Sequence, residues 1–480
     1  MKLSVLLSAI GAENSIQNDM EITSLCYDSR KVQKGSLFVC LNGETTDGHK
    51  YAKNAEQLGA CVIVAEHSTD SALPHIIVKD TREAIFSLAS AWYESPEKKM
   101  KFIGVTGTNG KTSTVYYIKH ILEGLGKKTG LIGTVANMIG DRVLPSNATT
   151  PEPLELMSLL DEMYKSGVEY VVMEVSSHSL VQKRVCGITF ETAVFTNLTR
   201  DHLDYHKTME NYMSAKAELF RMSKNAVINT DDEKGLELHR SLDCTRYSFS
   251  TIYNRADFVA KDIKLRSSGV SFLAVIKGGI ARVKVPSPGG FVVYNALGAI
   301  GAVLSLGFPF EQLIPVVANI GAVPGRAQII SGERPYTVMI DYAHTPDGLE
   351  NIISSVREFK VGRLITLFGC GGDRDKQKRP MMGEIASRLS DYVIVTSDNP
   401  RTEDPDAIIA DILPGVKKHR TPTKVITSRK EAIKYAIDIA NDGDVVLLAG
   451  KGHEKYQILN TGKIDFDEEQ IAAEFMEQKK

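Results

Sequence analysis

One segment of the chain has the residue types and the spacing of a phosphate-binding loop. Gly107 and Gly110 precede a lysine-threonine pair, between an apolar run that predicts a strand and a segment that predicts a helix. In such a loop the curled backbone N–H groups face a phosphate, Lys111 meets the β- and γ-phosphates, and Thr112 meets a magnesium ion. The strict P-loop pattern has glycine where this chain has Val105, so the segment is a variant. The candidate nucleotide-binding residues of the loop are Gly107, Thr108, Asn109, Gly110, Lys111, Thr112 and Ser113.

Two further groups of polar residues follow the ends of apolar strands. Glu174 ends the run 171–174, and the carboxyl end of a strand is where ligands bind in an open α/β sheet. Its carboxylate can hold a hard cation. Residues 200–206 bring a dense set of titratable groups to the end of another strand, which suits a charged reaction centre, and His202 could bind a second metal ion through a neutral imidazole.

The surrounding pattern predicts the elements that must position these residues. At 480 residues the chain is too long for one hydrophobic core. Short apolar runs alternate with turns and helical stretches throughout, which predicts α/β domains with parallel sheets. We expect domains at residues 1–98, 99–325 and 326–480. Strands are predicted at residues 36–39, 61–64, 76–78, 102–105, 170–174, 192–195, 226–229, 337–341, 364–368, 392–396 and 445–449, and a helix at 113–124.

The composition excludes several classes of protein. Hydrophobic residues make up 43% of the chain and the formal net charge is -2, so no basic field attracts a nucleic acid. The six cysteines show no metal-ligand spacing and indicate reduced thiols. Leu3, Leu6, Leu7 and Ile10 form a helical stripe, which favours a docked helix over a signal peptide. We expect a cytoplasmic monomer with no membrane partner.

Ten motifs, in chain order, resemble those of the Mur ligases. They are GVTGTNGKTST, the threonine pair before Pro151, EVSSHSLVQKR, TNLTRDHLDYH, YMSAKAELF, VPGR, DYAHTPD, FGCGGDRDKQKRP, SDNPRTEDP and GKGHE. The match runs from Asp28 to Glu454 and is most similar to the MurE branch, which adds the third residue of the peptidoglycan stem. The resemblance implies an N-terminal domain for a UDP-sugar, a central P-loop-type ATPase domain and a C-terminal Rossmann-like domain that binds the amino acid.

The resemblance also implies roles for individual residues. Ser29 would lie near the UDP portion of the substrate. Lys216 matches a lysine that the family carries as a carbamate, which can bind magnesium where an ammonium would repel it; from the residues alone it would be an exposed helix position. The muramoyl dipeptide would contact Thr149, Thr150, Ser176, Gln182 and Arg184, and ATP would also contact Asn295, Arg326, Asp341 and His344. The implied catalytic residues are Lys111, Glu174, His202 and Lys216, and the implied metal ligands are Thr112, Glu174, His202 and carbamylated Lys216.

The DNPR segment carries the implied choice of amino acid. In this family an arginine at Arg401 accompanies meso-diaminopimelate, whose distal carboxylate suits the guanidinium fork. The bare ammonium of lysine would meet Arg401 with like charge. Glu454 suits the distal ammonium. The implied pocket consists of Arg374, Asp398, Asn399, Pro400, Arg401, Gly450 and Glu454.

These residues lead us to expect an ATP- and Mg²⁺-dependent ligase. It would join meso-diaminopimelate to the D-Glu carboxylate of UDP-N-acetylmuramoyl-L-alanyl-D-glutamate through an acyl phosphate. One alternative is the same reaction with L-lysine or another diamino acid. A folylpolyglutamate synthase would leave the DSR and DNPR segments unexplained, and a non-catalytic nucleotide-binding module would not need a complete phosphoryl-transfer set.

Overall fold

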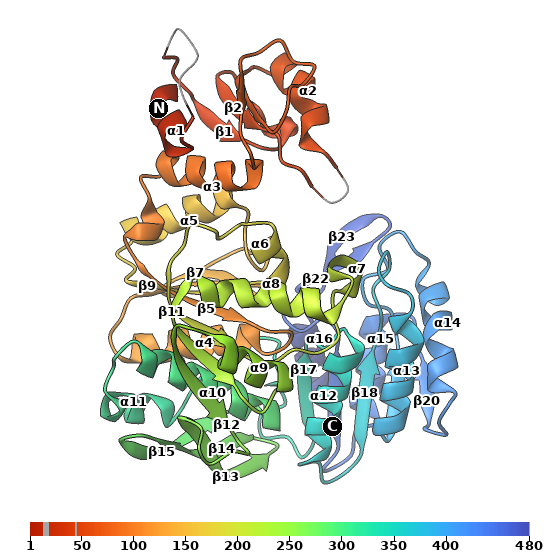
Figure 1. Cartoon of the computed structure of the whole chain (residues 1–480). Helices are drawn as coiled ribbons and strands as arrows, with labels where there is room; N and C mark the ends of the chain where they lie inside the picture. The colour runs from red at the N-terminus through yellow and green to blue at the C-terminus, as the bar shows by residue number, and fades with distance from the viewer. Residues whose placement is uncertain (13–18, 44–45, 480) are drawn as a thin grey trace.

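The computed structural model describes residues 1–12, 19–43 and 46–479, and Figure 1 shows one region for each of three main sheets. The N-terminal sheet lies at the top of that view, the central sheet below it, and the C-terminal sheet beside the central one. The strands of each sheet fall within one of the three segments expected from the sequence, while the limits of those segments remain a proposal. No helix in the described ranges is both long and apolar enough for a bilayer crossing.

The N-terminal domain is a four-stranded parallel sheet, in the order β1-β2-β3-β4, with helices packed against it. Its elements are α1 (Leu3–Ala9), β1 (Ser24–Cys26), β2 (Ser36–Val39), α2 (Ala52–Gln57), β3 (Ala60–Ala65), β4 (His75–Ile77) and α3 (Thr81–Trp92). The predicted docked helix is confirmed, because Leu3, Leu6 and Leu7 of α1 are buried.

Helix α3 belongs to two hydrophobic cores. Ile85 and Leu88 pack into the core of the N-terminal sheet. Phe86 and Ala89, on another face, pack into a core of the central domain, where a side chain at Gly187 would collide with the Phe86 ring at 2.2 Å. Figure 1 shows α3 between the N-terminal sheet and α5 (Pro153–Lys165). The N-terminal domain is therefore fastened to the central domain by shared apolar packing.

The central sheet has the order β15-β14-β13-β12-β11-β10-β5-β9-β6-β7-β8. Its strands are β5 (Lys101–Thr106), β6 (Thr129–Ile132), β7 (Asn137–Ile139), β8 (Arg142–Leu144), β9 (Tyr170–Glu174), β10 (Phe190–Phe195), β11 (Ser223–Asn229), β12 (Thr245–Ser250), β13 (Phe258–Arg266), β14 (Gly269–Ile276) and β15 (Gly279–Val285). The remaining helices are α4 (Lys111–Gly124), α6 (Ser177–Val181), α7 (Leu203–His206), α8 (Met209–Arg221), α9 (Glu233–Ser241), α10 (Gly290–Ser305) and α11 (Phe310–Val317).

Four strands at the parallel centre of this sheet, β11, β10, β5 and β9, were predicted, but β12, β6 and the antiparallel edges were not. Strands from β12 to β6 run parallel, and neighbouring residues of β5 face opposite cores: Phe102 packs toward α5 and α8, Ile103 toward α4 and α10. Strands β13, β14 and β15 are antiparallel, as are β6, β7 and β8. In β14 buried and half-buried residues alternate, the pattern of a sheet covered well on one face only. Residues 258–285 therefore carry no clear strand pattern in the sequence.

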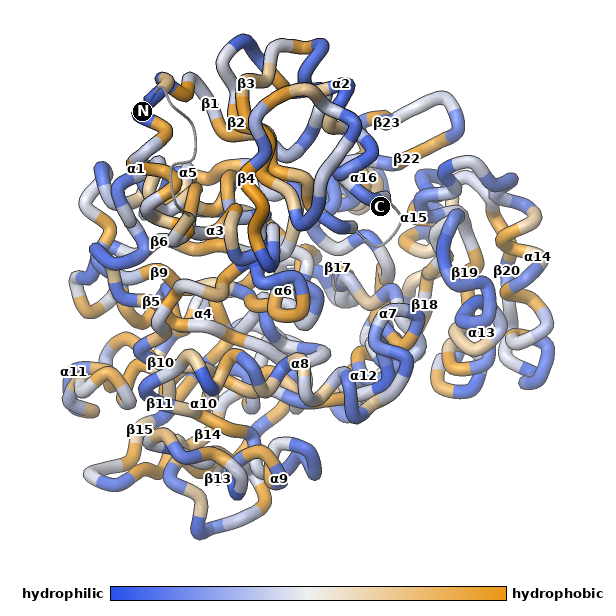
Figure 2. The backbone as a smooth tube through the Cα atoms, turned by 45° about the horizontal axis from the view of Figure 1, so that its top comes forward, coloured by the Kyte–Doolittle hydropathy of each residue, from blue (hydrophilic) through white to orange (hydrophobic). Residues whose placement is uncertain are grey.

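The C-terminal sheet has the order β16-β17-β21-β18-β19-β20 and is parallel except for β16, as a Rossmann-like domain predicts. Its strands are β16 (Gln328–Ile329), β17 (Thr337–Asp341), β18 (Leu364–Phe368), β19 (Tyr392–Val395), β20 (Thr423–Val425) and β21 (Val445–Ala449), followed by the hairpin β22 (Tyr456–Leu459) and β23 (Gly462–Asp465). Its helices are α12 (Pro346–Arg357), α13 (Lys378–Leu389), α14 (Pro405–Val416), α15 (Arg429–Asp438) and α16 (Glu468–Gln478). Figure 2 shows apolar stretches alternating with hydrophilic ones along the chain in all three domains.

A buried arginine joins the strand ends of the C-terminal sheet. The guanidinium of Arg429 donates to the Glu468 carboxylate at 2.6 Å and to the Ala449 carbonyl at 2.8 Å. A longer hydrogen bond of 3.4 Å reaches the carbonyl of Ser397. The side chains of Arg429 and Glu468 are 0% and 1% exposed. Because residues 398–401 and 450–454 follow these strand ends, Arg429 fixes the base of the expected amino-acid pocket.

We predict that Arg429→Met strongly destabilises the C-terminal domain. Removing one partner of a buried ion pair leaves the other charge buried and typically costs about 3 to 5 kcal/mol. Lys434→Met is the matched control on the same helix, because its pair with Asp438 is about half exposed and contributes less than about 1 kcal/mol. Urea unfolding monitored by amide hydrogen exchange of the C-terminal sheet measures both. Equal unfolding midpoints for the two variants would contradict the role given to Arg429.

Candidate active site

The loop between β5 and α4 requires glycine at two positions. Gly107 and Gly110 have φ angles of 147° and 84°, in the region that side chains disfavour. A Cβ on Gly107 would lie 1.8 Å from the Thr196 hydroxyl, and one on Gly110 would lie 2.3 Å from the Asn295 side-chain oxygen. The close approach of Asn295, on α10, also places this predicted nucleotide residue beside the loop. Ser113 is buried within α4.

Two lysines converge on one carbonyl of this loop. Lys111, at the start of α4, donates to Gly107 O at 2.9 Å and to Thr108 O at 2.8 Å. Lys216 reaches the same Gly107 oxygen from α8 at 2.8 Å and lies over the Tyr212 ring, 4.4 Å from its centroid. Burial lowers the pKa of Lys111. Two amino groups aimed at one oxygen indicate a site that an anion would complete.

The exposed position that the residues alone suggested for Lys216 is wrong. Lys216 is 1% exposed, because Tyr212, Lys216 and Leu219 share the buried face of α8. Burial lowers the pKa of Lys216 well below its ordinary value, and the neighbouring charge of Lys111 lowers it further. Lys216 is thus held in the neutral, nucleophilic amine form more readily than a surface lysine.

Hard oxygen ligands meet at the end of β9. Glu174 is 1% exposed and accepts hydrogen bonds from the Thr112 hydroxyl at 3.0 Å and from the backbone N–H of Thr134 at 2.8 Å. Arg326 donates to the same Thr112 hydroxyl at 3.2 Å. The carboxylate and hydroxyl oxygens suit a hard divalent cation, so the predicted pair of ligands is brought together.

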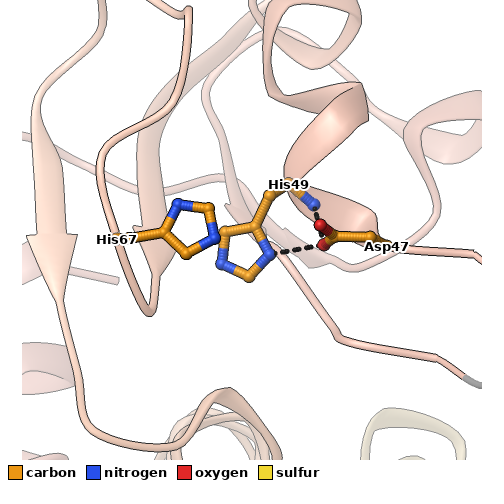
Figure 3. A group of neighbouring side chains, drawn as sticks. All are labelled: Asp47, His49 and His67. Atoms are coloured by element: carbon orange, nitrogen blue, oxygen red, sulfur yellow. Dashed lines mark hydrogen bonds and ion pairs between the residues drawn. The ribbon is translucent and has the colours of Figure 1, made fainter.

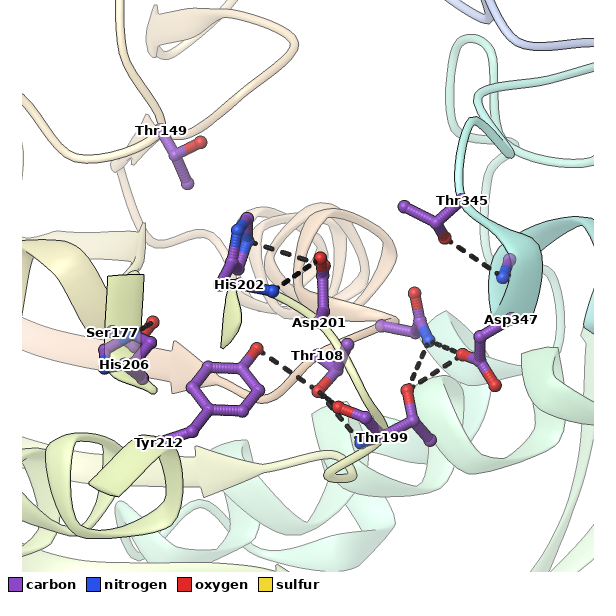
Figure 4. Close-up of polar contacts among 12 residues, drawn as sticks. Thr108, Thr149, Ser177, Thr199, Asp201, His202, His206, Tyr212, Thr345 and Asp347 are labelled. Atoms are coloured by element: carbon purple, nitrogen blue, oxygen red, sulfur yellow. Dashed lines mark hydrogen bonds and ion pairs between the residues drawn. The ribbon is translucent and has the colours of Figure 1, made fainter. Parts of the chain in front are cut away.

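His202 and His206 lie near the Tyr212 ring, as Figure 4 shows. His202 has a φ of 53° at the start of α7, and its Nε2 lies 3.4 Å from a carboxylate oxygen of Asp201. The rings of His202 and His178 meet edge to face, with centroids 4.8 Å apart. Burial lowers the pKa of His202, and burial with nearby charges lowers the pKa of His206 to about 4. A neutral imidazole is the form that binds a metal.

The predicted dipeptide residues form a connected network beside Glu174. The Thr150 hydroxyl donates to the Glu174 carbonyl at 2.8 Å and accepts from the Ser176 N–H at 3.2 Å. The Thr149 and Thr134 hydroxyls lie 3.0 Å apart. These contacts place the threonine pair and Ser176 at the same strand end as the predicted metal ligands.

Arg184 is occupied by partners within the protein. Its guanidinium donates to Gln182 Oε1 at 2.6 and 3.0 Å and to the Thr150 carbonyl at 2.8 Å. It also pairs with Glu152 at 2.8 Å, and Glu152 pairs with Arg82 of α3 at 3.2 Å. A substrate carboxylate at Arg184 must therefore exchange places with Glu152.

The C-terminal domain brings its predicted nucleotide residues to the same loop. The Arg326 guanidinium stacks on the Tyr342 ring, 4.6 Å from its centroid, and the rings of His344 and His453 lie 4.6 and 5.0 Å from Tyr342. Asp341 accepts from the backbone N–H groups of Ala327 and Ala343 at 2.7 and 2.8 Å, and burial raises the pKa of Asp341. Asp341 thus fixes the backbone next to Arg326.

The expected amino-acid pocket contains a buried lysine that sequence reasoning did not assign. Lys451 is fully buried and donates to Asn399 Oδ1 and Glu454 Oε2, each at 3.1 Å. Asn399 also donates to Glu454 at 2.9 Å. Lys451 lies in the GKGHE motif that follows β21. Its place next to the end of a buried strand was the sequence signal that could have identified it as a pocket residue. Lys451 holds Asn399 and Glu454 in place and offsets the charge of Glu454.

Arg401 and its neighbours complete the pocket wall. Arg401 has a φ of 54°, its N–H donates to Ile458 O at 3.0 Å, and its guanidinium donates to Gly372 O at 2.6 Å. Gly372 lies against the Pro400 carbonyl, and a Cβ on Gly450 would lie 2.7 Å from Asp398 Oδ2. The exposed Arg374 lies beside Arg401, because a Cβ on Gly371 would lie 3.2 Å from Arg401 Nη1 and 3.9 Å from Arg374 Cγ. Arg374 also lines an open cavity of about 540 Å³ together with Asp204 of the central domain.

Ser29 lies in a separate part of the molecule. It is buried in a short 3-10 turn, η1 (Ser29–Lys31). Its neighbours Asp28 and Lys31 line a cavity of about 560 Å³ between β1 and α5. Within the described residues, the hydrogen bonds of the phosphate-binding loop come from the central and C-terminal domains, so Ser29 is not brought to that loop.

A group of potential metal ligands in the N-terminal domain is better explained as a hydrogen-bonded pair. Asp47, His49 and His67 place three ligand atoms within 4.8 Å of one another (Figure 3). His49 Nδ1 lies 2.6 Å from Asp47, and His49 Nε2 accepts the N–H of Glu66 at 3.0 Å. A metal on Nδ1 would leave the proton on Nε2, facing the Glu66 N–H. This donor-donor conflict disfavours a metal.

Comparison with known proteins gives matches over nearly the whole chain. Residues 21–93 match the model described as Mur ligase family, catalytic domain. Residues 105–303 match the Mur ligase middle domain, and residues 325–452 match the Mur ligase, glutamate ligase domain.

Individual relatives match from end to end. A Clostridium botulinum protein named UDP-N-acetylmuramoyl-L-alanyl-D-glutamate--2,6-diaminopimelate ligase is 46% identical, with 100% of both chains covered. A protein of the same name from Caldanaerobacter subterraneus is 45% identical over 99% of both chains. A solved structure, also of a ligase with this name, has a TM-score of 0.71 at 33% identity and 98% coverage of both chains. A folylpolyglutamate synthase from Mycobacterium tuberculosis shares the fold at 17% identity, with a TM-score of 0.62 over 76% of this chain and 92% of its own. Because sequence identity and structure agree along the full length, the chain belongs to the Mur ligase family.

Proposed function

We propose that this protein uses ATP to add meso-diaminopimelate to the D-Glu carboxylate of UDP-N-acetylmuramoyl-L-alanyl-D-glutamate, a step of peptidoglycan precursor synthesis. The observation that carries the proposal is the pair of lysines, Lys111 and Lys216, converging on the Gly107 carbonyl beside the buried Glu174. The names of the full-length relatives support the choice of substrates. A folylpolyglutamate synthase is less well supported, because the likeness to that enzyme extends to the fold alone.

The chain's own residues account for the two steps of such a reaction. The substrate carboxylate attacks the γ-phosphorus of ATP, and the bond between this phosphorus and the β,γ-bridging oxygen breaks. ADP departs, and the product of this step is an acyl phosphate. Lys111 and the loop N–H groups stabilise the charge on the transferred phosphoryl group. The amine of the amino acid then attacks the acyl carbon, inorganic phosphate departs, and the amine loses a proton to form the amide.

The donor set beside the loop fits magnesium. Thr112 and Glu174 would hold one ion through oxygen atoms. Neutral His202 and carbamylated Lys216 would be ligands of a second ion. When bound, magnesium offsets negative charge on the phosphate oxygens. The depressed pKa of Lys216 favours carbamylation, since only the neutral amine attacks carbon dioxide, and loss of a proton then gives an anionic carbamate.

The pocket around Arg401 supports diaminopimelate over lysine. Within the described residues, the Arg401 side chain makes one hydrogen bond, to Gly372 O, which leaves most of its fork for a carboxylate. Lys451 and Glu454 offset each other's charge, so Arg401 is the cation that would attract a distal carboxylate and repel the bare ammonium of lysine. The proposed enzyme acts as a monomer in the cytoplasm on a soluble UDP-linked substrate, with neither nucleic acid nor membrane as a partner.

Phosphate release from ATP with the UDP-linked dipeptide tests the proposed function. We expect release that depends on meso-diaminopimelate and equals the UDP-tripeptide measured by mass spectrometry, with little release for L-lysine or no amino acid. Phosphate release that depends on L-lysine would support the ligase reaction but reject meso-diaminopimelate as the substrate. Phosphate release that is the same with and without any diamino acid would reject the proposed ligase reaction.

We predict that Arg401→Met raises the KM for meso-diaminopimelate about tenfold to a hundredfold, because a charge-assisted hydrogen bond contributes about 1.5 to 3 kcal/mol. The ratio of kcat/KM for meso-diaminopimelate to kcat/KM for L-lysine should fall at the same time. Arg420→Met, an exposed arginine of the same domain, is the control and should change neither quantity. An unchanged ratio of kcat/KM for the two amino acids in Arg401→Met would exclude Arg401 from substrate selection.

We predict a carbamate on Lys216 that labelled bicarbonate makes visible as a ¹³C resonance in the wild-type protein. Lys216→Met should remove this resonance and lower kcat by ~100-fold or more, through lost electrostatic stabilisation. Lys119→Met is the matched buried control, because the Lys119 amine already pairs with Glu123 at 2.7 Å. A resonance that persists in Lys216→Met would assign the carbamate elsewhere.

A further inference from the structure

The C-terminal domain contacts the phosphate-binding loop directly through Asp347. The Asn109 side-chain amide donates to Asp347 Oδ2 at 2.6 Å, and the Thr199 hydroxyl donates to the same oxygen at 2.8 Å (Figure 4). Asp347 is separated from these donors by 238 and 148 positions in the chain. No role was expected for Asp347, because its partners could not be read from local sequence.

Asp347 is held firmly on its own domain. It lies in the first turn of α12, where Thr345 caps the helix by accepting the Gly348 N–H at 3.1 Å. A carboxylate in the first turn is favoured by the helix dipole. Asn351, one turn later, also donates to Asp347 Oδ2 at 3.2 Å. The carboxylate therefore faces the loop as a preorganised acceptor.

The donors are held just as firmly on the central domain. The backbone N–H of Asn109 donates to Asn197 Oδ1 at 2.9 Å, and its carbonyl accepts the Thr196 hydroxyl at 2.6 Å. The Thr199 N–H donates to the Thr108 hydroxyl at 3.0 Å. The direction of the Asn109 side chain is thus set by the backbone of the loop. Both donors reach Asp347 together only when the loop has this shape and the C-terminal domain is docked.

We propose that Asp347 is a positioning residue that couples docking of the C-terminal domain to the nucleotide-ready shape of the phosphate-binding loop. The proposal rests on the proposed function. Asp347 acts through Asn109 and Thr199, because a carboxylate would repel phosphate if it approached directly. By thermodynamic reciprocity, a contact that steadies the loop when the domain docks also favours docking when the loop holds nucleotide. Docking in turn keeps water from the acyl phosphate.

The coupling of phosphate release to amide formation tests this role. The wild type should release one phosphate per amide. Asp347→Ala should lower kcat for the amide about a hundredfold or more, as expected for the loss of two hydrogen bonds to a charged group. Its phosphate-to-amide ratio should rise above one, because water reaches the acyl phosphate. Asp347→Asn, which keeps the shape and a weaker acceptor, should give an intermediate ratio. Glu350→Ala is the control on the same helix, since Glu350 pairs only with the exposed Arg388 in the described structure and should leave the ratio at one.

A double-variant cycle separates positioning from general damage. Asn109→Ala removes the loop donor, and in combination with Asp347→Ala it should reduce kcat no further than the more severe single change. Effects that multiply in the double variant would overturn the proposal. So would an Asp347→Ala protein that matches Glu350→Ala in the phosphate-to-amide ratio, with equal Tm values for both.

A measurement without ligation keeps this inference distinct from the proposed function. Fluorescent labels on the central and C-terminal domains of the full chain should approach on addition of ATP in the wild type and in Glu350→Ala, but not in Asp347→Ala. If the wild type forms no amide with any diamino acid, the proposed function fails. The change in distance between the labels still tests the Asp347 contact in that case. Equal approach in Asp347→Ala and the wild type would reject the contact itself.

Discussion

The convergence of Lys111 and Lys216 on the Gly107 carbonyl is the constraint on which the rest of the site depends. It needs glycine at 107, because the Thr196 hydroxyl occupies the space of a Cβ. It also needs α8 to bury an amino group over the Tyr212 ring, and that burial shifts Lys216 toward the neutral amine. Parallel strand ends, the loop and α8 are thus arranged around two amino groups that disfavour each other's positive charge.

Continuous apolar runs made the centre of the fold predictable. The strands β9, β17, β18 and β21 have the limits that the sequence predicts, because both of their faces are buried. The edge strands β13 to β15 escaped prediction, since one-sided burial gives a weaker pattern. Motifs singled out residues 107–113 and the polar residues that the structure places around them. The burial of Lys216 and Lys451 and the partners of Asp347, however, depend on segments distant in the chain. Such contacts leave no local signal.

The cations expected to bind substrate already have partners inside the protein. Arg184 pairs with Glu152, Arg401 donates to Gly372 O, and Lys111 rests on loop carbonyls. Substrate binding is then an exchange of partners rather than the filling of an empty charged site. Each exchange contributes less binding free energy than a contact made by an unpaired cation would. A ligand whose acceptors are misplaced cannot displace the original partners. This arrangement favours selectivity over raw affinity.

Helix α3 gives the three domains unequal freedom. Its residues fill two cores at once, so the N-terminal domain cannot pivot without exposing Phe86 and Ala89 to water, whereas the Asp347 contact that holds the C-terminal domain to the loop is polar and exchangeable. A fixed spacing between the N-terminal domain and the phosphate-binding loop acts as a ruler. In the proposed reaction, a substrate anchored by its nucleotide presents its carboxylate at the loop only if the intervening peptide has the right length. The rigid packing of α3 thus selects the length of the substrate, and the exchangeable Asp347 contact lets the C-terminal domain move when the amino acid binds.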